Sequence, residues 1–464
     1  MKHSEIGIIG LGVMGKSLTR NLAQKGFQIS MYNRHVEGQE ENVARDFQQS
    51  FPELHNSQAF DDLQGFVDSL ATPRKILMMI PAGAAIDDFL EQIESLLQPN
   101  DILVDGGNSH FEDTQRRMGH LQKKGIHFIG AGISGGQLGA LHGPSIMPSG
   151  DLSAYEHVQK FLEAISAKDA QGNPCCTYIG PEGSGHFVKM IHNGIEYVEM
   201  QLLAECYFLL RQQAYSNHQM ADIFENWRDD LDSYLLQITV DILRKKEGEE
   251  YVLDTILDQA ENKGTGKWST QTIATAGSPA GLIPTALLVR YLSSFKSKRV
   301  QFSKEFAFSP VHPDIALDDL KATYGLARII NHHQGFWTIV QWSSQQNWQL
   351  NLSEIARVWT QGCIIQSDLM AEIKTLLKQS DEILSTSAIR QLIVESYPKA
   401  QRVVSSAINA SCAVPCFSET VQYFQGLITA DSPANLLQAQ RDFFGEHTYL
   451  KKGDPLRTKH TTEW

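Results

Sequence analysis

One segment of the chain places five chemically useful side chains on a single helical face. Between Gly185 and Tyr197 the sequence reads GHFVKMIHNGIEY. Residues at i, i+3, i+4, i+7 and i+8 share one face of a helix. Here that face carries a candidate base, a candidate acid and several hydrogen-bonding groups, namely Lys189, His192, Asn193, Glu196 and Tyr197. A solvated polar stripe is the alternative. The strongly apolar flanks instead predict a buried helix, whose polar groups need partners that a ligand could supply.

A glycine-rich turn near the N-terminus predicts a dinucleotide site. Residues 10–15 read G-x-G-x-x-G, between a strand-like run at 5–10 and a helical pattern from Met14 to Lys25. Glycines at this spacing allow a tight turn, a close approach to the pyrophosphate and close packing of the helix, whose N-terminus favours phosphate. Residues 130–135 match the same pattern but lack a clean helix start, so context favours the first copy. The expected cofactor contacts are Gly10, Gly12, Val13, Met14 and Gly15.

The end of the second strand, expected at 27–32, indicates which dinucleotide is bound. An NAD site usually has Asp or Glu about 20 residues after the glycines, to hold the ribose 2′-hydroxyl. This chain has Asn33, Arg34 and His35 there, with no carboxylate. The Arg34 guanidinium can pair with a 2′-phosphate instead. We therefore predict NADP as the cofactor, with a surface arginine in a loop as the alternative.

Three further loops carry groups suited to a ligand. Asn108 follows the strand expected at 102–105, and residues 133–136 offer a serine hydroxyl and backbone N–H groups. The stretch 263–268 is typical of an anion cradle, with Lys263 as its cation and Thr265 as a donor. It lacks the spacing and the preceding strand of a P-loop. The first two loops could also be simple turns.

The elements that must position these groups fall into two kinds. Strand candidates at 5–10, 27–32, 75–80, 102–105 and 127–129 alternate with helices, which predicts a parallel sheet covered on both faces. From about residue 185 long helical patterns follow, at 187–213, 220–244 and 317–346. The fold class expected is an α/β Rossmann dinucleotide-binding domain (1–180), a large all-α domain (181–435) and a C-terminal tail (436–464). The tail is polar and loses its periodicity after Phe444, so we expect it to need another surface to pack against.

Composition narrows the class of protein. The 464 residues carry a formal net charge of −13, which argues against nucleic acid or an anionic membrane as the main partner. No apolar run approaches the ~20 residues of a membrane helix, and the N-terminus lacks a hydrophobic signal core, so a cytoplasmic location is expected. Six scattered cysteines show no zinc spacing. We expect reduced, buried thiols and no metal.

Taken together, these stretches resemble the 6-phosphogluconate dehydrogenase family (decarboxylating) over nearly the whole chain. The ending at 460–464 is similar to that of bacterial members. Several independent blocks in the same order make this resemblance more specific than any single motif; they lie at 107–108, 134–136, 185–197, 262–268, 290–294, 362–365 and 440–449.

The resemblance implies a reaction and a set of roles. The reaction is the oxidative decarboxylation of 6-phospho-D-gluconate to D-ribulose 5-phosphate and CO2 with reduction of NADP, in the pentose phosphate pathway. Lys189 would be the general base and later an acid, and Glu196 the second acid. The sugar acid would be held by Asn108 (which also contacts the cofactor), Ser134, Gly135, Gly136, His192 and Asn193. Its phosphate would be bound by Tyr197, Lys263, Thr265 and Arg290, and by Arg441 and His447 from the tail of the partner in a homodimer.

The chain departs from the family pattern at five positions without losing a proposed catalytic group. Pro81 stands where a lysine is common, and His35 where a small hydroxyl residue is common. Gln137 and Leu138 replace a pair of glutamates, and Val198 replaces a glycine.

Two other interpretations remain open. The first is a related β-hydroxyacid dehydrogenase that prefers NAD or needs no phosphate on its substrate. It would not require Lys263, Arg290, Arg441 and His447 together. The second is a non-catalytic paralogue that binds a sugar phosphate, which would require neither Lys189 nor Glu196.

Overall fold

A seven-stranded sheet forms the N-terminal part of the molecule. The computed structural model describes residues 3–261, 264–306 and 311–464. The strand order is β3-β2-β1-β4-β5-β6-β7, and all neighbours are parallel except β6 and β7. This is the Rossmann order with an added antiparallel edge strand. The strands are β1 (Ile6–Ile9), β2 (Ile29–Tyr32), β3 (Gln58–Phe60), β4 (Lys75–Met78), β5 (Ile102–Asp105), β6 (His127–Ser134) and β7 (Ser145–Gly150).

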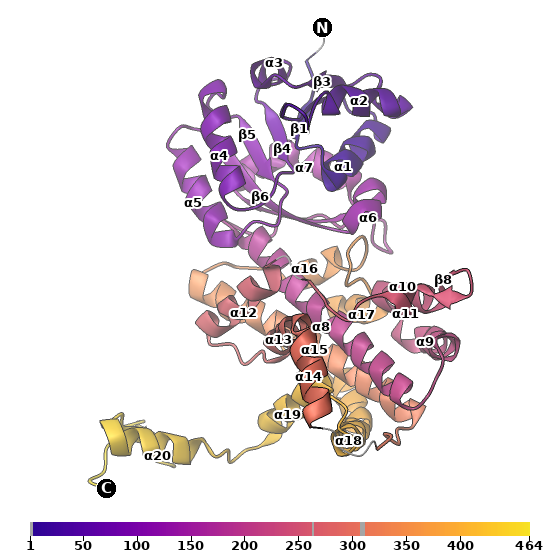
Figure 1. The fold of residues 1–464 in the computed structure, drawn as a ribbon. Coiled ribbons are helices and arrows are strands. Elements are labelled where there is room, and N and C mark those ends of the chain that lie inside the picture. Colours follow the sequence, from indigo (N-terminus) through magenta and orange to yellow (C-terminus); the bar gives the residue numbers. More distant parts are fainter. Residues whose placement is uncertain (1–2, 262–263, 307–310) are drawn as a thin grey trace.

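Helices cover both faces of this sheet, as the alternating pattern predicted (Figure 1). Because both faces are covered, β1, β2 and β5 are buried along their whole length. The helices are α1 (Val13–Gln24), α2 (Val43–Ser50), α3 (Leu63–Asp68), α4 (Ala84–Ile93), α5 (Phe111–Gln122), α6 (Gly136–His142) and α7 (Leu152–Ile165), with short 3-10 turns at Pro52–Leu54 and Glu94–Leu96. The edge strand β7 was not predicted from the sequence.

The second part of the molecule is helical, as expected. Its long helices α8 (Ser184–Gln212) and α15 (Leu317–Gln346) pack against each other at the centre. Around them lie α9 (Asn217–Leu231), α10 (Tyr234–Arg244), α11 (Val252–Thr255), α12 (Thr265–Ala276), α13 (Leu282–Ser294), α14 (Lys296–Glu305), α16 (Leu352–Val358), α17 (Asp368–Leu376), α18 (Ser387–Asn409) and α19 (Pro415–Ile428), a 3-10 turn at Ile383–Ser385 and a hairpin of β8 (Lys246–Glu247) and β9 (Glu250–Tyr251).

The segment predicted as one helix at 220–244 is two helices. The break lies at Asp232 and Ser233, where the backbone is extended. The Ser233 hydroxyl accepts a hydrogen bond from the Leu236 N–H at 3.1 Å and so caps α10. The prediction failed because the apolar spacing continues across a capping serine.

A buried ion pair joins the two central helices. Arg328 Nε on α15 donates to Glu199 Oε2 on α8 at 2.9 Å, and both side chains are at most 3% exposed. Arg328 also donates to the Leu231 carbonyl, and Asn331 Nδ2 donates to the Ile195 carbonyl on α8. These contacts hold α8 in one register on α15.

Replacing Arg328 with methionine should destabilise the fold strongly. The change leaves the Glu199 carboxylate buried without its cation, which typically costs about 3–5 kcal/mol. Denaturant unfolding measures the loss. Arg402→Met is the matched control, because the Arg402–Asp319 pair lies on the surface and its loss should change stability little. Equal stability of the two variants would contradict this assignment.

The C-terminal tail lies apart from the rest of the chain. Helix α20 (Ala434–Gly445) and a hairpin of β10 (Tyr449–Leu450) and β11 (Lys459–His460) project beyond the helical part (Figure 1). Asp442 organises this unit: its carboxylate accepts hydrogen bonds from the Thr448 N–H, the Thr462 N–H and the Trp464 indole, each at 3.0 Å. The tail therefore has a defined shape, with little of the main body against it.

In the described part of the chain, none of the helices has the length and apolar character needed to cross a membrane. All six cysteines lie among the described residues; they are buried and unpaired, as expected.

Candidate active site

Helix α8 starts directly against strands β6 and β7, and two glycines make this approach possible. A Cβ at Gly132 on β6 would lie 2.3 Å from the Cβ of Lys189, and a Cβ at Gly185 would lie 2.1 Å from the Met147 carbonyl oxygen. Larger residues at either position would push the helix off the sheet. The sequence thus delivers Lys189 to the end of β6, where Ser134 lies.

Lys189, His192 and Ser134 form a chain of contacts inside the protein. Lys189 Nζ lies 3.3 Å from His192 Nδ1, and His192 Nε2 lies 3.4 Å from Ser134 Oγ. Glu196 Oε2 lies 3.8 Å from His192 Nδ1. Lys189, His192 and Ser134 are buried, whereas the Glu196 side chain is 23% exposed. The amine and the carboxyl thus face the same side of α8 and both approach Nδ1 of the His192 imidazole.

Burial shifts the protonation of these groups toward their neutral forms. It lowers the pKa of Lys189 below its ordinary 10.5, although Glu196 and Cys363 act in the opposite direction. Burial likewise raises the pKa of Glu196 above its ordinary 4.5, against the effects of Lys189 and Arg290. The pKa of His192 falls well below 6.5, through burial and then through the Lys189 charge. A neutral amine and a protonated carboxyl are the forms a base and an acid need.

A second polar group is centred on Tyr197, the residue that follows Glu196 on α8. The guanidinium carbon of Arg290 on α13 is 3.5 Å from the centre of the Tyr197 ring, and Thr265 begins α12 beside it. A Cβ at Gly266 would lie 2.7 Å from the Tyr197 ring, and the Ser269 hydroxyl donates to the Met190 carbonyl at 2.8 Å. The structure thus brings Tyr197, Thr265 and Arg290 together. Lys263 lies outside the described residues.

The structure places the remaining candidates for the sugar acid on three separate segments. Gly135 and Gly136, both with positive φ, lead from β6 into α6, and Gly135 packs against the Gly362 carbonyl. Asn193 is buried on α8. Asn108 is exposed in a separate loop, after β5. Cys363, next to Gly362, is a buried thiol close to Lys189, and sequence reasoning did not single it out as a site residue.

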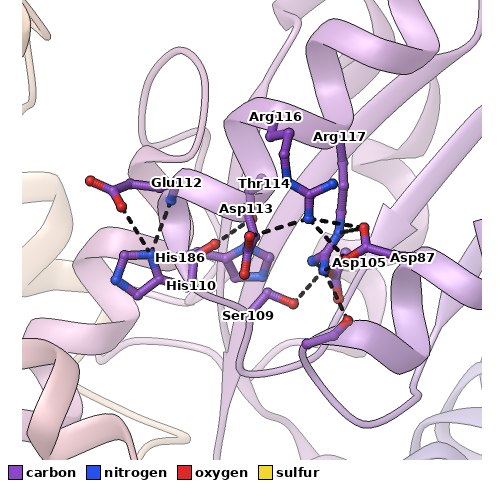
Figure 2. A network of polar contacts seen from close by, with 11 residues as sticks. Asp87, Asp105, Ser109, His110, Glu112, Asp113, Thr114, Arg116, Arg117 and His186 are labelled. Carbon is purple, nitrogen blue, oxygen red and sulfur yellow. Dashed lines mark hydrogen bonds and ion pairs between the residues drawn. The ribbon is translucent and has the colours of Figure 1, made fainter.

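A buried network fixes the loops at the carboxyl ends of β4 and β5 (Figure 2). Arg117 on α5 donates to Asp87 Oδ1 at 2.9 Å and to the Gly83 carbonyl at 3.0 Å, and its Nη1 lies 3.8 Å from Asp105 Oδ2. Asp105 in turn accepts from the Gly107 N–H and from the Ser109 hydroxyl. The loop that carries Asn108 is therefore held on both sides.

The same network reaches the start of α8. His186 Nδ1 lies 2.7 Å from the Thr114 hydroxyl of α5, and both residues are buried (Figure 2). His186 is one turn before Lys189 on α8. The α8 amine and the Asn108 loop are thus tied to one rigid element, α5.

The glycine turn has the geometry that a pyrophosphate needs. Gly10 has φ +87°, and a Cβ at Gly15 would lie 1.9 Å from the Gly10 carbonyl oxygen, so both positions require glycine. Helix α1 begins at Val13 with Gly12 as its N-cap and no acidic residue in its first turn, so its N-terminal N–H groups suit a phosphate. Gly12 and Val13 are exposed and Met14 is partly buried. The turn lies between β1 and β4, where the strand order reverses and ligands of such sheets bind.

The end of β2 differs from the prediction in one respect. No carboxylate was expected there, but Glu40 folds back onto it. Glu40 Oε1 lies 3.0 Å from Arg34 Nη2, and Oε2 accepts from Asn33 Nδ2 at 2.9 Å. Asn33 Oδ1 accepts from the Leu11 N–H in the glycine turn, and His35 is exposed. No signal in the sequence pointed to Glu40, because the loop that carries it has no regular period.

Two of the predicted substrate residues, Arg441 and His447, are far from the Lys189 site of their own chain. Arg441 and His447 lie on the projecting tail, exposed to solvent (Figure 1). Within the described residues there is also no group of three or more His, Cys, Asp and Glu side chains placed to hold a metal ion.

Comparison with known proteins assigns the whole chain. Residues 5–180 match the model of the NAD binding domain of 6-phosphogluconate dehydrogenase, and residues 185–464 match the model of the 6-phosphogluconate dehydrogenase C-terminal domain. The chain belongs to the 6-phosphogluconate dehydrogenase family. The resemblance found in the sequence is thereby confirmed.

Relatives of known function are similar along their full length. The chain is 43% identical to an NADP(+)-dependent, decarboxylating 6-phosphogluconate dehydrogenase of Bacillus subtilis and 41% identical to the decarboxylating enzyme of Escherichia coli strain K12, with 100% of both chains covered in each case. Among solved structures, that of Plasmodium falciparum 6-phosphogluconate dehydrogenase matches with a TM-score of 0.92 and 35% identity, covering 99% of this chain and 100% of the other. That protein was solved alone, with its cofactor NADP+ and with its substrate 6-phosphogluconate.

Proposed function

We propose that this chain oxidatively decarboxylates 6-phospho-D-gluconate to D-ribulose 5-phosphate, reducing NADP. The observation that carries the proposal is one face of α8, where a buried amine and a carboxyl border a cluster suited to a phosphate. Residues 1–180 would bind the nucleotide, residues 181–435 the substrate, and residues 436–464 would complete a neighbouring site. The reaction fits a cytoplasmic enzyme of the pentose phosphate pathway.

Lys189 performs the first proton transfer. When bound, NADP supplies the acceptor for the hydride that leaves C3 of the substrate. The neutral Lys189 amine takes the proton of the 3-hydroxyl as that hydride departs. His192 and Ser134 orient the amine and, with Asn193, Gly135, Gly136 and Asn108, hold the sugar acid. The product of this step is a 3-keto acid whose carbonyl is β to the carboxylate.

The same amine then assists the loss of CO2. Lys189, now protonated, gives its proton to the 3-carbonyl oxygen, while the electron pair of the breaking C1–C2 bond forms the C2=C3 double bond of an enediol and CO2 leaves. The Glu196 carboxyl then gives its proton to C1 of the enediol, which is C2 of the substrate, while the hydroxyl on the neighbouring carbon returns its proton to Lys189, and ribulose 5-phosphate results. Before the first step Lys189 must be neutral and Glu196 protonated, and these are the states that burial favours.

The substrate phosphate lies, in this proposal, between α8, α12 and α13. Tyr197 and Thr265 supply hydroxyl donors, and Arg290 and Lys263 supply positive charge. Arg290 stacks on the Tyr197 ring, so its guanidinium is already ordered before the ligand binds. Arg441 and His447 would add two further groups from a partner chain.

A homodimer explains the projecting tail. Helix α20 and its hairpin expose several large apolar side chains, which single chains seldom leave in solvent: Leu436, Leu437, Phe443, Phe444, Leu456 and Trp464. In a symmetric dimer each tail can lie on the other subunit. Arg441 and His447 would then reach the partner's phosphate cluster.

A substrate panel tests the proposed function. Purified protein is assayed by absorbance of the reduced nucleotide, with 6-phosphogluconate, gluconate and 3-hydroxyisobutyrate, each with NADP and with NAD. We expect turnover of 6-phosphogluconate with NADP, and little with the two acids that lack a phosphate. Equal turnover of gluconate would favour the β-hydroxyacid dehydrogenase interpretation, and no turnover of any acid would favour a binding protein.

Cofactor choice gives a separate prediction. Arg34→Ala should weaken the binding of NADP by roughly 10–100-fold and that of NAD by much less. The reason is that a guanidinium–phosphate contact is charge-assisted and NAD lacks that phosphate. Titration of each nucleotide by calorimetry measures both dissociation constants. An equal loss for NADP and NAD would refute a role for Arg34 at the 2′-phosphate.

A further inference from the structure

The loop after β2 doubles back on itself and returns a carboxylate to the strand end. Val36 and Glu40 form an antiparallel bridge, with the Glu40 N–H donating to the Val36 carbonyl at 2.8 Å and the Val36 N–H donating to the Glu40 carbonyl at 2.9 Å. The Glu41 carboxylate accepts from the Gly38 N–H inside the turn. This closed turn brings the Glu40 side chain beside Arg34 and Asn33, six or seven residues earlier.

Glu40 engages the donors that a 2′-phosphate would use. One of its oxygens pairs with the Arg34 guanidinium at 3.0 Å and the other accepts from the Asn33 carboxamide at 2.9 Å. Hydrogen bonds from Arg34 and Asn33 lower the pKa of Glu40, so the group is a carboxylate at neutral pH. The Glu40 charge thus offsets part of the Arg34 charge before a nucleotide binds, at a position where the two side chains are 71% and 36% exposed.

A carboxylate at this position affects the binding of NADP and of NAD in opposite directions. The 2′-phosphate of NADP is a dianion near neutral pH, so it must displace Glu40 from Arg34 and is repelled by it. The 2′-hydroxyl of NAD can instead donate a hydrogen bond to the carboxylate, the contact made by acidic residues at the same place in NAD sites. Arg34 and Glu40 thus act in opposite directions on the same position of the ribose.

We propose that Glu40 is a specificity-determining residue that limits the preference for NADP and allows the chain to use NAD. The proposal rests on the proposed function, because it concerns the cofactor of that reaction. It concerns nucleotide binding alone, however, and can be measured without a substrate.

The test is Glu40→Gln, which keeps the size and the hydrogen-bonding oxygen but removes the charge. Calorimetry on the intact protein gives the dissociation constants of NADP and NAD. We expect NADP to bind about tenfold more tightly and NAD a few-fold more weakly, since Arg34 is released and the 2′-hydroxyl loses a charged acceptor. The matched control is Glu37→Gln, which removes an equal charge from an exposed position in the same loop and should leave the ratio of the two constants close to wild type.

The outcomes separate this proposal from the proposed function. An unchanged ratio in Glu40→Gln, a ratio that moves equally in Glu37→Gln, or a weaker affinity for NADP would overturn the role of Glu40. A raised NADP preference without any turnover of 6-phosphogluconate would support Glu40 and reject the reaction. The double variant Arg34→Ala/Glu40→Gln should lose the part of the gain that comes from releasing Arg34 and keep only the part that comes from removing the repulsion by Glu40.

Discussion

Lys189→Met is expected to abolish turnover of 6-phosphogluconate while leaving NADP binding intact. Methionine matches the length of the lysine side chain and is well tolerated in buried sites. It lacks the amine that, in the mechanism above, first accepts and then donates a proton. General acid–base catalysis contributes roughly 10²–10⁴-fold to a step, and this residue serves two steps. We therefore expect at least a ~10³-fold loss of kcat.

The measurement is steady-state production of NADPH, together with the affinity for NADP. Nucleotide affinity should stay near the wild-type value, because the glycine turn and Arg34 lie on elements other than α8, which carries Lys189. Lys160→Met is a suitable control, since that lysine is exposed on α7. Wild-type kcat in Lys189→Met would eliminate the lysine mechanism.

A mixed dimer should recover the activity that two inactive variants lack. Arg441→Ala should reduce kcat/KM by roughly 10²–10³-fold, since a charged hydrogen bond to the phosphate is lost. If each tail completes the site of the other subunit, a heterodimer of Lys189→Met and Arg441→Ala contains one intact site. It then combines an intact amine in one chain with an intact tail from the other.

The two variants carry different affinity tags and are expressed together, so that the heterodimer can be isolated. It should show about half of the wild-type activity, because one of its two sites is complete. Each homodimer, purified in the same way, is the control. An inactive heterodimer would mean that Arg441 serves the site of its own chain, which contradicts the exchange of tails, and a fully active Arg441→Ala homodimer would mean that it serves none.

Local patterns predicted the parts of the site that lie on one element. The polar face of α8 followed from helical spacing, and its buried setting followed from apolar neighbours such as Val188 and Ile191. The glycine turn was predicted for a similar reason, since its strand, turn and helix are contiguous. Such features depend on residues within two or three turns of each other.

Features that depend on distant parts of the chain could not be predicted. Glu40 reaches Arg34 through an irregular turn, and Cys363 reaches Lys189 from a loop of the helical part. The break between α9 and α10 was missed although Ser233 is a good capping residue, because apolar spacing outweighed it in the interpretation. In the proposed dimer, the place of Arg441 and His447 relative to the site would depend on a second chain, which neither the sequence nor one chain can fix.

In the proposed mechanism, an amine and a carboxyl on α8 supply the proton transfers for both the oxidation and the decarboxylation. The most direct measurement follows NADPH by absorbance and CO2 by mass spectrometry in one reaction of wild-type protein with 6-phosphogluconate, in the presence of a metal chelator. We predict equal amounts of both products at a rate that the chelator does not change. NADPH without CO2, or a rate that falls when metal is removed, would contradict this mechanism.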